Sequence, residues 1–148
     1  MSKVFFYQFE SARFEDIFVK YLQKIYPLGK IEVRLKNDES LKNLDNLIWR
    51  KSDISFLPHE IYSEQKNLSP IILTKEKIKR AVFKSLILLE GCSLELTEIN
   101  DYERLAIFFE KNNIIQLEYS RKLWKELKLK DIKLKYYMQN QMKWIEVF

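Results

Sequence analysis

Glycine is scarce in this chain, which has only Gly29 and Gly91 among its 148 residues. Loops that wrap a nucleotide phosphate need two or three glycines in a short span, because the backbone must approach the phosphate closely. The junction after the first expected strand, Phe9-Glu10-Ser11-Ala12-Arg13, has no glycine and carries an acidic residue that would repel phosphate. We therefore expect no nucleotide-binding loop.

Cysteine and histidine each occur once, as Cys92 and His59. A lone cysteine forms neither an intrachain disulfide nor a thiolate metal site, and a single histidine removes most zinc chemistry. A Ser/His/Asp arrangement stays open, but no nucleophile-elbow spacing accompanies His59. The acidic pairs Asp38–Glu39 and Glu95–Glu98 are interpreted as surface and capping residues. We expect no cofactor, no metal and no catalytic site, so the chain is interpreted as a protein that is not an enzyme.

Long apolar runs are also missing, and none approaches the roughly 20 residues that span a bilayer. The first residues are predicted to form a strand, and they lack the apolar segment and cleavage site of a signal peptide. Apolar residues make up 47% and charged residues 32% of the chain, the balance of a globular protein rather than a disordered one. We expect one cytoplasmic domain over residues 1–148, with no membrane contact.

The net charge of +5 is concentrated near the C-terminus. Residues 112–148 hold eight basic and four acidic side chains, so they carry +4 of it. A positive surface raises encounter rates with nucleic acid, membranes or acidic peptides. A solvated face with a lysine-rich bias explains the count equally well.

Strand-like and helix-like segments alternate along the chain. Expected strands cover 4–9, 31–35, 70–74, 83–89, 104–109 and 132–138. Three helices are expected: one capped by Ser11 and ended by Pro27 and Gly29, one from Asn37 or Asp38 to Trp49 or Arg50, and one from Asn112 or Asn113 to about Lys130. We also expect a helical turn at 75–80, a loop over 51–69, and Trp144 in the C-terminal tail. This order predicts an α/β fold, a Rossmann-like three-layer sandwich whose mostly parallel sheet has helices on both faces.

The last long helix has two distinct faces when it is projected at about 100° per residue. One stripe, the expected core face, holds Ile115, Tyr119, Leu123 and Leu127. The opposite side mixes apolar and basic residues: Ile114, Leu117, Arg121, Trp124, Lys125 and Lys128. A purely solvated face would not be expected to carry a tryptophan among these cations.

An acidic peptide that ends in an apolar side chain matches this second face. Arg121 offers a forked donor to a carboxylate, a bond that contributes on the order of 1.5–3 kcal/mol. An aromatic anchor such as Trp124 contributes at least about 2 kcal/mol, and the lysines steer the ligand. After the association costs we expect roughly micromolar binding that weakens with salt. The alternative is that Trp124 packs under a loop or the C-terminal tail.

A second aromatic feature is Leu44-Asp45-Asn46-Leu47-Ile48-Trp49 followed by Ser55-Phe56-Leu57-Pro58-His59. Two large aromatics flank a polar stretch, and Pro58 holds Leu57 extended. The feature predicts either a second protein-binding edge or core packing at a helix end.

Together these blocks resemble the chi subunit of bacterial DNA polymerase III. The resemblance covers nearly the whole chain, from the strand at Val4 through Leu44-Asp45-x-x-Ile48-Trp49 and Ser55 to His59, to the Arg121-x-x-Trp124-Lys125 helix and Trp144. It implies a Rossmann-like fold without a nucleotide and a role in DNA replication within the clamp-loader assembly. There, chi proteins link the loader to single-stranded DNA-binding protein by gripping its acidic C-terminal tail, which ends in phenylalanine, and so reach DNA indirectly.

The resemblance also assigns residues. Arg121, Trp124 and Lys125 match the family's tail-binding helix, to which the helix projection adds Lys128 and Leu117. Trp49 and Phe56, with the neighbouring Pro58 and His59, match positions that dock the psi subunit or a helicase. One departure is Asp131, which stands where the family often has a glycine after the helix.

Two other readings stay open. The first is a protein that binds single-stranded nucleic acid directly, with stacking by Trp124, Tyr136, Tyr137 and Trp144. The second is a small nucleotide-using or hydrolytic enzyme, which the fold permits but no residue pattern supports.

Overall fold

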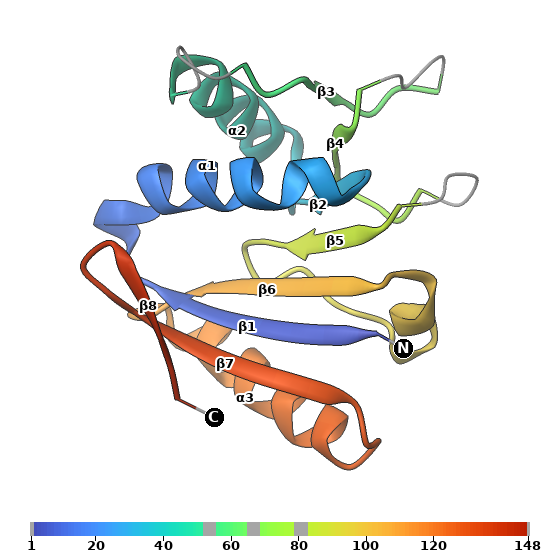
Figure 1. The fold of residues 1–148 in the computed structure, drawn as a ribbon, viewed down its shortest axis with the longest axis vertical. Helices are drawn as coiled ribbons and strands as arrows, with labels where there is room; N and C mark the ends of the chain where they lie inside the picture. Colours follow the sequence, from blue (N-terminus) through green and yellow to red (C-terminus); the bar gives the residue numbers. More distant parts are fainter. Residues whose placement is uncertain (1, 52–55, 65–68, 79–82, 148) are drawn as a thin grey trace.

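A single eight-stranded sheet forms the centre of the molecule (Figure 1). The computed structural model describes residues 2–51, 56–64, 69–78 and 83–147. The strands lie in the order β3-β4-β2-β5-β6-β1-β7-β8, and every neighbouring pair is parallel except β7 and β8. Their bounds are β1 Lys3–Phe9, β2 Ile31–Arg34, β3 His59–Ile61, β4 Ile71–Thr74, β5 Ser85–Leu88, β6 Arg104–Glu110, β7 Lys133–Asn140 and β8 Lys143–Glu146.

Helices cover both faces of the sheet, as predicted. α1 (Phe14–Ile25) and α2 (Asp38–Lys51) lie on one face, and α3 (Ile114–Lys128) lies on the other (Figure 1). Three short 3₁₀ segments complete the elements: η1 Ser11–Arg13, η2 Tyr26–Leu28 and η3 Leu96–Asp101. The three-layer α/β prediction is therefore confirmed.

Strand β1 shows why the sheet is buried on both sides. Its side chains alternate between the faces, so Phe5 and Tyr7 join the core under α1 and α2 while Val4 and Phe6 join the core under α3. A continuous apolar run is what a central parallel strand requires. The core therefore consists of two layers separated by the sheet.

The helix ends follow local chemistry. The Asn113 side chain accepts a hydrogen bond from the Gln116 backbone N–H at 3.0 Å and caps α3, and Asn37 does the same for Ser40 of α2 at 2.8 Å. Gly29, at φ 147°, follows η2 in a conformation that favours glycine. No helix within the described ranges is long and apolar enough to cross a membrane.

Four local expectations were wrong. The segment 51–69 contains β3, and the tail that holds Trp144, after the strand expected at 132–138, contains a further strand, β8. Residues 75–78 are not helical, and residues 79–80 lie outside the described residues. Ser11 begins η1 and α1 starts at Phe14 without a side-chain cap. β3 has only three residues, His59–Ile61, too few for the alternation of a strand to be recognised in the sequence.

A buried ion-pair cluster ties β2 to η3. Arg34 lies 2.7 Å from the Glu32 carboxylate and 3.0 Å from that of Glu98, and Tyr102 Oη donates to Glu32 at 2.7 Å. Glu98 was predicted to be a surface or capping residue, but it is 3% exposed, although it does form a capping box with Glu95. Glu98 can be buried because Arg34 neutralises it. The two residues are 64 positions apart, so the sequence gives no sign that they are neighbours.

Candidate functional site

The buried face of α3 differs from the predicted one. Ser120, Leu123 and Leu127 are buried, but Ile115 is 80% exposed, so its assignment to the core was wrong. Residues spaced by four drift about 40° around a helix at each step, and a stripe of four therefore turns away from the sheet at one end. The sheet contacts the C-terminal end of that stripe.

Trp124 lies at the edge of the α3 interface, half-buried. Its ring packs edge-on against Phe6 of β1 at 5.3 Å and Tyr136 of β7 at 5.7 Å between centroids. The Nζ atom of Lys128 lies 5.8 Å from the same ring. The indole is thus held by the sheet rather than under a loop, and part of it stays accessible beside a cation.

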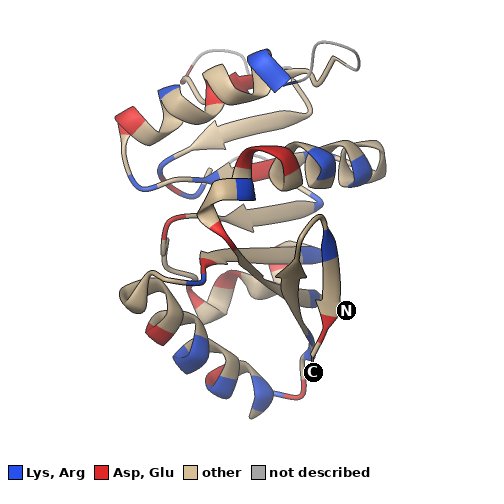
Figure 2. Ribbon diagram, turned by 90° about the vertical axis from the view of Figure 1, so that its left-hand side faces the viewer, with Lys and Arg blue, Asp and Glu red and all other residues tan. Residues whose placement is uncertain are grey.

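Arg121 is exposed one turn before Lys125 and close to Tyr136. Burial raises the pKa of the Tyr136 phenol, and the positive charge of Arg121 acts in the opposite direction on that pKa. Tyr136 Oη donates to Gln8 Oε1 at 2.6 Å, which fixes the ring. At about 100° per residue, the five predicted residues of α3 fall on one flank of the helix. Lys125 is exposed and Leu117 is half-buried. Figure 2 shows basic and acidic residues alternating along the helix.

The β7–β8 hairpin supplies an apolar shelf beside this flank. The Val147 N–H donates to the Tyr136 carbonyl at 2.8 Å, and Ile145 pairs with Met138. Directly opposed residues in an antiparallel pair share a face, so Met138, Ile145 and Val147 lie on the α3 side of the sheet. They are 36%, 48% and 42% exposed.

The shelf was missed by sequence reasoning, although the alternation of residues 143–147 is a weak strand signal. We call the combined region the α3–β8 surface. It comprises Leu117, Arg121, Trp124, Lys125, Lys128, Tyr136, Met138, Ile145 and Val147.

The turn that follows α3 accommodates Asp131 in place of a glycine. Asp131 has φ 54°, the left-handed conformation that glycine favours. Aspartate tolerates this region better than most residues, because its short side chain can form local hydrogen bonds. Asp131 in place of glycine therefore still permits the left-handed turn that leads from α3, which ends at Lys128, into β7, which begins at Lys133.

The second predicted surface also has exposed aromatics. Trp49 is 51% and Phe56 62% exposed, and their ring centroids lie 5.5 Å apart. His59 is buried beneath Trp49 at 4.9 Å, with Nδ1 2.7 Å from the Leu57 carbonyl oxygen. Its Nε2 lies 3.0 Å from the Asp45 carboxylate but without hydrogen-bond geometry. His59 therefore supports the aromatic pair from below, and Pro58 is half-buried next to it.

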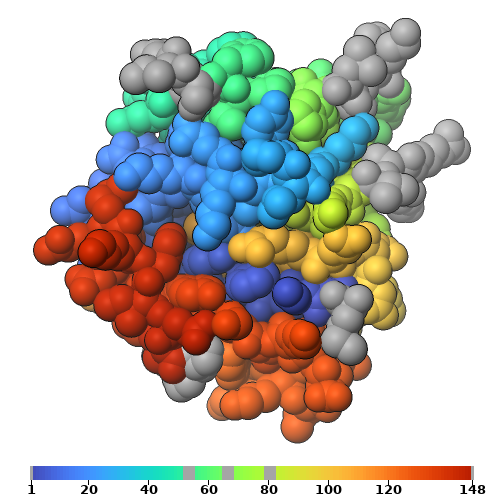
Figure 3. Space-filling view, viewed as in Figure 1, coloured from blue at the N-terminus to red at the C-terminus, as the bar shows by residue number. Residues whose placement is uncertain are grey.

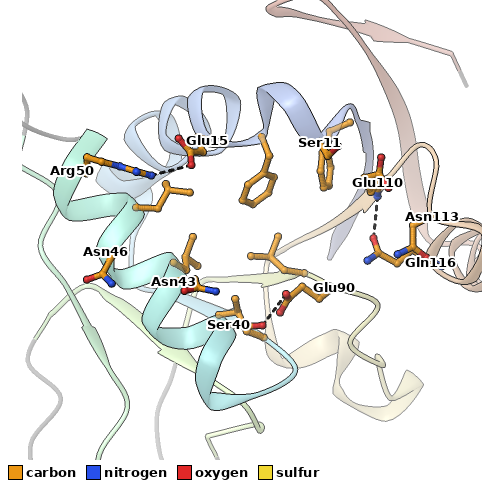
Figure 4. Close-up of a pocket in the computed structure, with 16 residues that line it drawn as sticks. Ser11, Glu15, Ser40, Asn43, Asn46, Arg50, Glu90, Glu110, Asn113 and Gln116 are labelled. Carbon is orange, nitrogen blue, oxygen red and sulfur yellow. Dashed lines mark hydrogen bonds and ion pairs between the residues drawn. The ribbon is translucent and has the colours of Figure 1, made fainter.

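A cavity of about 680 Å³ lies where nucleotides bind in Rossmann-like folds, beyond the carboxyl ends of the parallel strands (Figure 4). Its described lining includes Glu15, Glu90 and Glu110 but a single cation, Arg50, which pairs with Glu15 at 2.9 Å. Ser40 donates to Glu90 at 2.8 Å. The rim of this cavity is therefore acidic.

Helix N-termini at this edge would normally attract a phosphate. Here the first turns of α1 and α2 carry their own carboxylates, Glu15, Asp16, Asp38 and Glu39. The Glu10 backbone N–H, at the end of β1, donates to Gln139 Oε1 at 2.7 Å. The Glu10 N–H is therefore already occupied, and the carboxylates in the first turns of α1 and α2 repel a phosphate.

Cys92 is expected to be chemically inert near neutral pH. Burial, reinforced by the Glu90 carboxylate, raises the pKa of its thiol to about 11. Because the thiolate is the reactive form, alkylation at pH 8 should be more than about a hundredfold slower than for a free thiol of pKa about 8.5. The rate should rise about tenfold per pH unit toward pH 11. Iodoacetamide labelling followed by mass spectrometry measures this, with the denatured protein as control, and labelling of the folded protein as fast as that control would contradict it.

Comparison with known proteins places the chain in context. The model of a family described as "DNA polymerase III chi subunit, HolC" matches residues 1–135, so the whole shelf of Met138, Ile145 and Val147 lies beyond the matched part. A search of curated proteins finds no match.

Two solved structures share the fold at 10% sequence identity. One is S. cerevisiae Dbp5 L327V bound to Nup159, Gle1 H337R, IP6 and ADP, with a TM-score of 0.61 over 95% of this chain and 42% of that one. The other is the C-terminal domain of the DEAD-box protein Dbp5, with a TM-score of 0.60 over 93% of this chain and 90% of that one. At this identity the likeness concerns the fold alone.

Proposed function

The chain belongs to the DNA polymerase III chi subunit family, and we propose that it is a non-catalytic replisome adaptor whose α3–β8 surface holds the acidic C-terminal tail of single-stranded DNA-binding protein. In this role it links that protein to the clamp loader. Residues 1–148 act in it as a single chi-like domain.

The observation that carries this proposal is the position of Arg121 beside a half-buried but partly accessible Trp124 and an apolar shelf. A tail that ends in phenylalanine presents a terminal carboxylate, an aromatic ring and further acidic side chains. The Arg121 guanidinium suits the carboxylate, and Trp124 with Met138 and Ile145 suits the ring. Lys125 and Lys128 lie on the same flank and steer the acidic residues.

The charge distribution also disfavours a different location for the tail. The cavity at the carboxyl edge of the sheet is lined by Glu15, Glu90 and Glu110, which would repel an acidic peptide. α3 carries four basic and two acidic side chains, so it is net positive: Arg121, Lys122, Lys125 and Lys128 against Glu118 and Glu126. Electrostatics thus favours the α3–β8 surface.

Titration of the full chain with a fluorescent acidic peptide ending in phenylalanine tests the proposal. We expect a dissociation constant of roughly micromolar size at low salt. The favourable free energy comes mainly from one arginine contact and one aromatic anchor, and the entropy lost on association offsets part of it. Affinity should fall as salt rises, since exposed charges are screened. An amidated peptide, which lacks the terminal carboxylate, is the matched control and should bind more weakly. Failure of the acidic peptide to bind at low salt would rule the proposal out.

For the second surface we propose a different protein partner, the psi subunit of the clamp loader or a helicase. Trp49 and Phe56 form an exposed aromatic pair, and the buried His59 supports it. Exposed aromatic pairs of this kind are typical anchors at protein interfaces. Two separate surfaces are what an adaptor between two proteins requires.

A further inference from the structure

A second cavity, of about 470 Å³, lies on the opposite face of the β7–β8 hairpin, between the hairpin and α1. Five aromatic rings line it, from β1, α1, β7 and β8, together with three cations, Lys20, Lys24 and Arg104. None of the described residues that line it is acidic. α1 and the hairpin lie on either side of β1 on this face of the sheet (Figure 3). A ligand would therefore enter between α1 and the hairpin.

Arg104 is the unusual residue of this cavity. Its Nε donates to Tyr21 Oη at 3.0 Å, its Nη2 donates to Tyr7 Oη at 3.2 Å, and its guanidinium lies 4.0 Å over the Phe5 ring. Among the residues that the structure describes, no carboxylate forms an ion pair with it. A half-buried cation with only neutral acceptors is best complemented by an anion.

The aromatic walls are suited to a flat ring. Tyr137 stacks on Tyr7 with centroids 5.3 Å apart, and Trp144 meets Tyr7 edge-on at 5.0 Å. Tyr137 and Trp144 are both half-buried and line the cavity, so part of each ring remains accessible. Aromatic side chains of this kind stack with any nucleobase, because every base has a π-face.

Further cations continue from the cavity along the sheet. Lys3 of β1 pairs in register with Arg104 of β6 and with Lys133 of β7, which places all three on the α1 face at the amino ends of the strands. Lys20 and Lys24 lie about one turn apart on the exposed side of α1. An extended polyanion could follow these charges, whereas a single small anion would need fewer of them.

We propose that this face binds single-stranded nucleic acid directly, with one base against Tyr137 and Trp144 and the adjacent phosphates on Arg104, Lys20 and Lys24. The interaction is independent of the tail-binding proposal, because the cavity and the α3–β8 surface lie on opposite faces of the β7–β8 hairpin. The sheet separates the four aromatic residues that the sequence predicts to stack with bases into two pairs. Tyr137 and Trp144 face this cavity, whereas Trp124 and Tyr136 belong to the other face.

Fluorescence anisotropy with a labelled oligothymidine of about 12 nucleotides, a length within the range for one small binding domain, tests the proposal at low salt. Lys20→Gln/Lys24→Gln should weaken binding about tenfold and lower the slope of log affinity against log salt by about 1.4, because each lysine that no longer neutralises a phosphate lowers that slope by about 0.7. Both lysines are exposed, so folding should be unaffected. The matched control is Lys42→Gln/Lys111→Gln, which removes the same charge from exposed positions outside the cavity lining and should bind as the unmodified protein does.

A stacking readout completes the test. In a Trp49→Phe/Trp124→Phe variant Trp144 is the remaining tryptophan, and the oligothymidine should quench its emission. The proposal is overturned if the unmodified protein does not bind the oligonucleotide, or if the control variant loses as much affinity as Lys20→Gln/Lys24→Gln. Quenching of Trp144 by the acidic phenylalanine-terminated peptide but not by the oligonucleotide would overturn it in favour of a second peptide site.

Discussion

Replacing Arg121 by alanine is expected to weaken binding of the acidic, phenylalanine-terminated peptide by about tenfold to a hundredfold, the range for one charge-assisted hydrogen-bonded interaction. Arg121 is exposed, so the free energy of unfolding should stay within about 0.5 kcal/mol of its original value. Trp124→Ala should reduce affinity by about 30-fold or more, as an aromatic anchor contributes at least about 2 kcal/mol. Isothermal titration calorimetry measures both effects.

Trp124→Ala also removes ring packing against Phe6 and Tyr136, so its melting temperature must be recorded alongside. Lys122→Ala is the matched control for Arg121, because it removes an exposed cation from the next position of the same helix but outside the α3–β8 surface. Trp49→Ala/Phe56→Ala controls for loss of exposed aromatics elsewhere. An Arg121→Ala protein that binds the peptide as tightly as the Lys122→Ala protein would refute the assignment.

Among the substitutions proposed for this protein, Arg34→Ala should cause the largest decrease in the free energy of unfolding. Arg34 is 6% exposed and bridges the buried carboxylates of Glu32 and Glu98. Burial disfavours its charged form, but the hydrogen bonds to Glu98 and Glu32 together with their negative charges outweigh burial and raise the pKa of Arg34. Removing one partner of a buried ion pair costs about 3–5 kcal/mol, because uncompensated charge stays in the interior. Urea unfolding followed by circular dichroism measures the change.

The matched control for Arg34 is Arg50→Ala, which breaks an exposed ion pair with Glu15. Exposed pairs contribute about 0–1 kcal/mol because water and salt screen them. The two variants delete the same side chain and differ mainly in burial. Equal losses of stability in the two proteins would show that the buried cluster is not a major support of the fold.

Much of the fold could be predicted because its signals are local. α3 begins and ends within about two residues of the prediction, since Asn113 caps it and the apolar spacing is helical. Strands such as β1 and β6 appeared as apolar runs. β3 and β8 have only three and four residues, too few for alternation to be a strong signal. The burial of Glu98 depends on Arg34, 64 residues away in the sequence, and nothing in the residues around Glu98 identifies that partner.

The candidate site shows the same division. Arg121, Trp124 and Lys125 share a flank because helix geometry alone brings them together. The shelf of Met138, Ile145 and Val147 requires the hairpin register, which becomes visible only in three dimensions. The cavity around Arg104 is assembled from five separate elements, so sequence spacing gives no sign of it.

The most direct measurement of the central claim is an amide, methyl and indole NMR titration of the labelled protein with the acidic, phenylalanine-terminated peptide. We expect the Trp124 indole, the Met138 and Ile145 methyls and the Arg121 backbone amide to shift together and to saturate at one affinity. Shifts confined to Trp49 and Phe56, or to the cavity around Arg104, with the Trp124 signals unmoved, would contradict it.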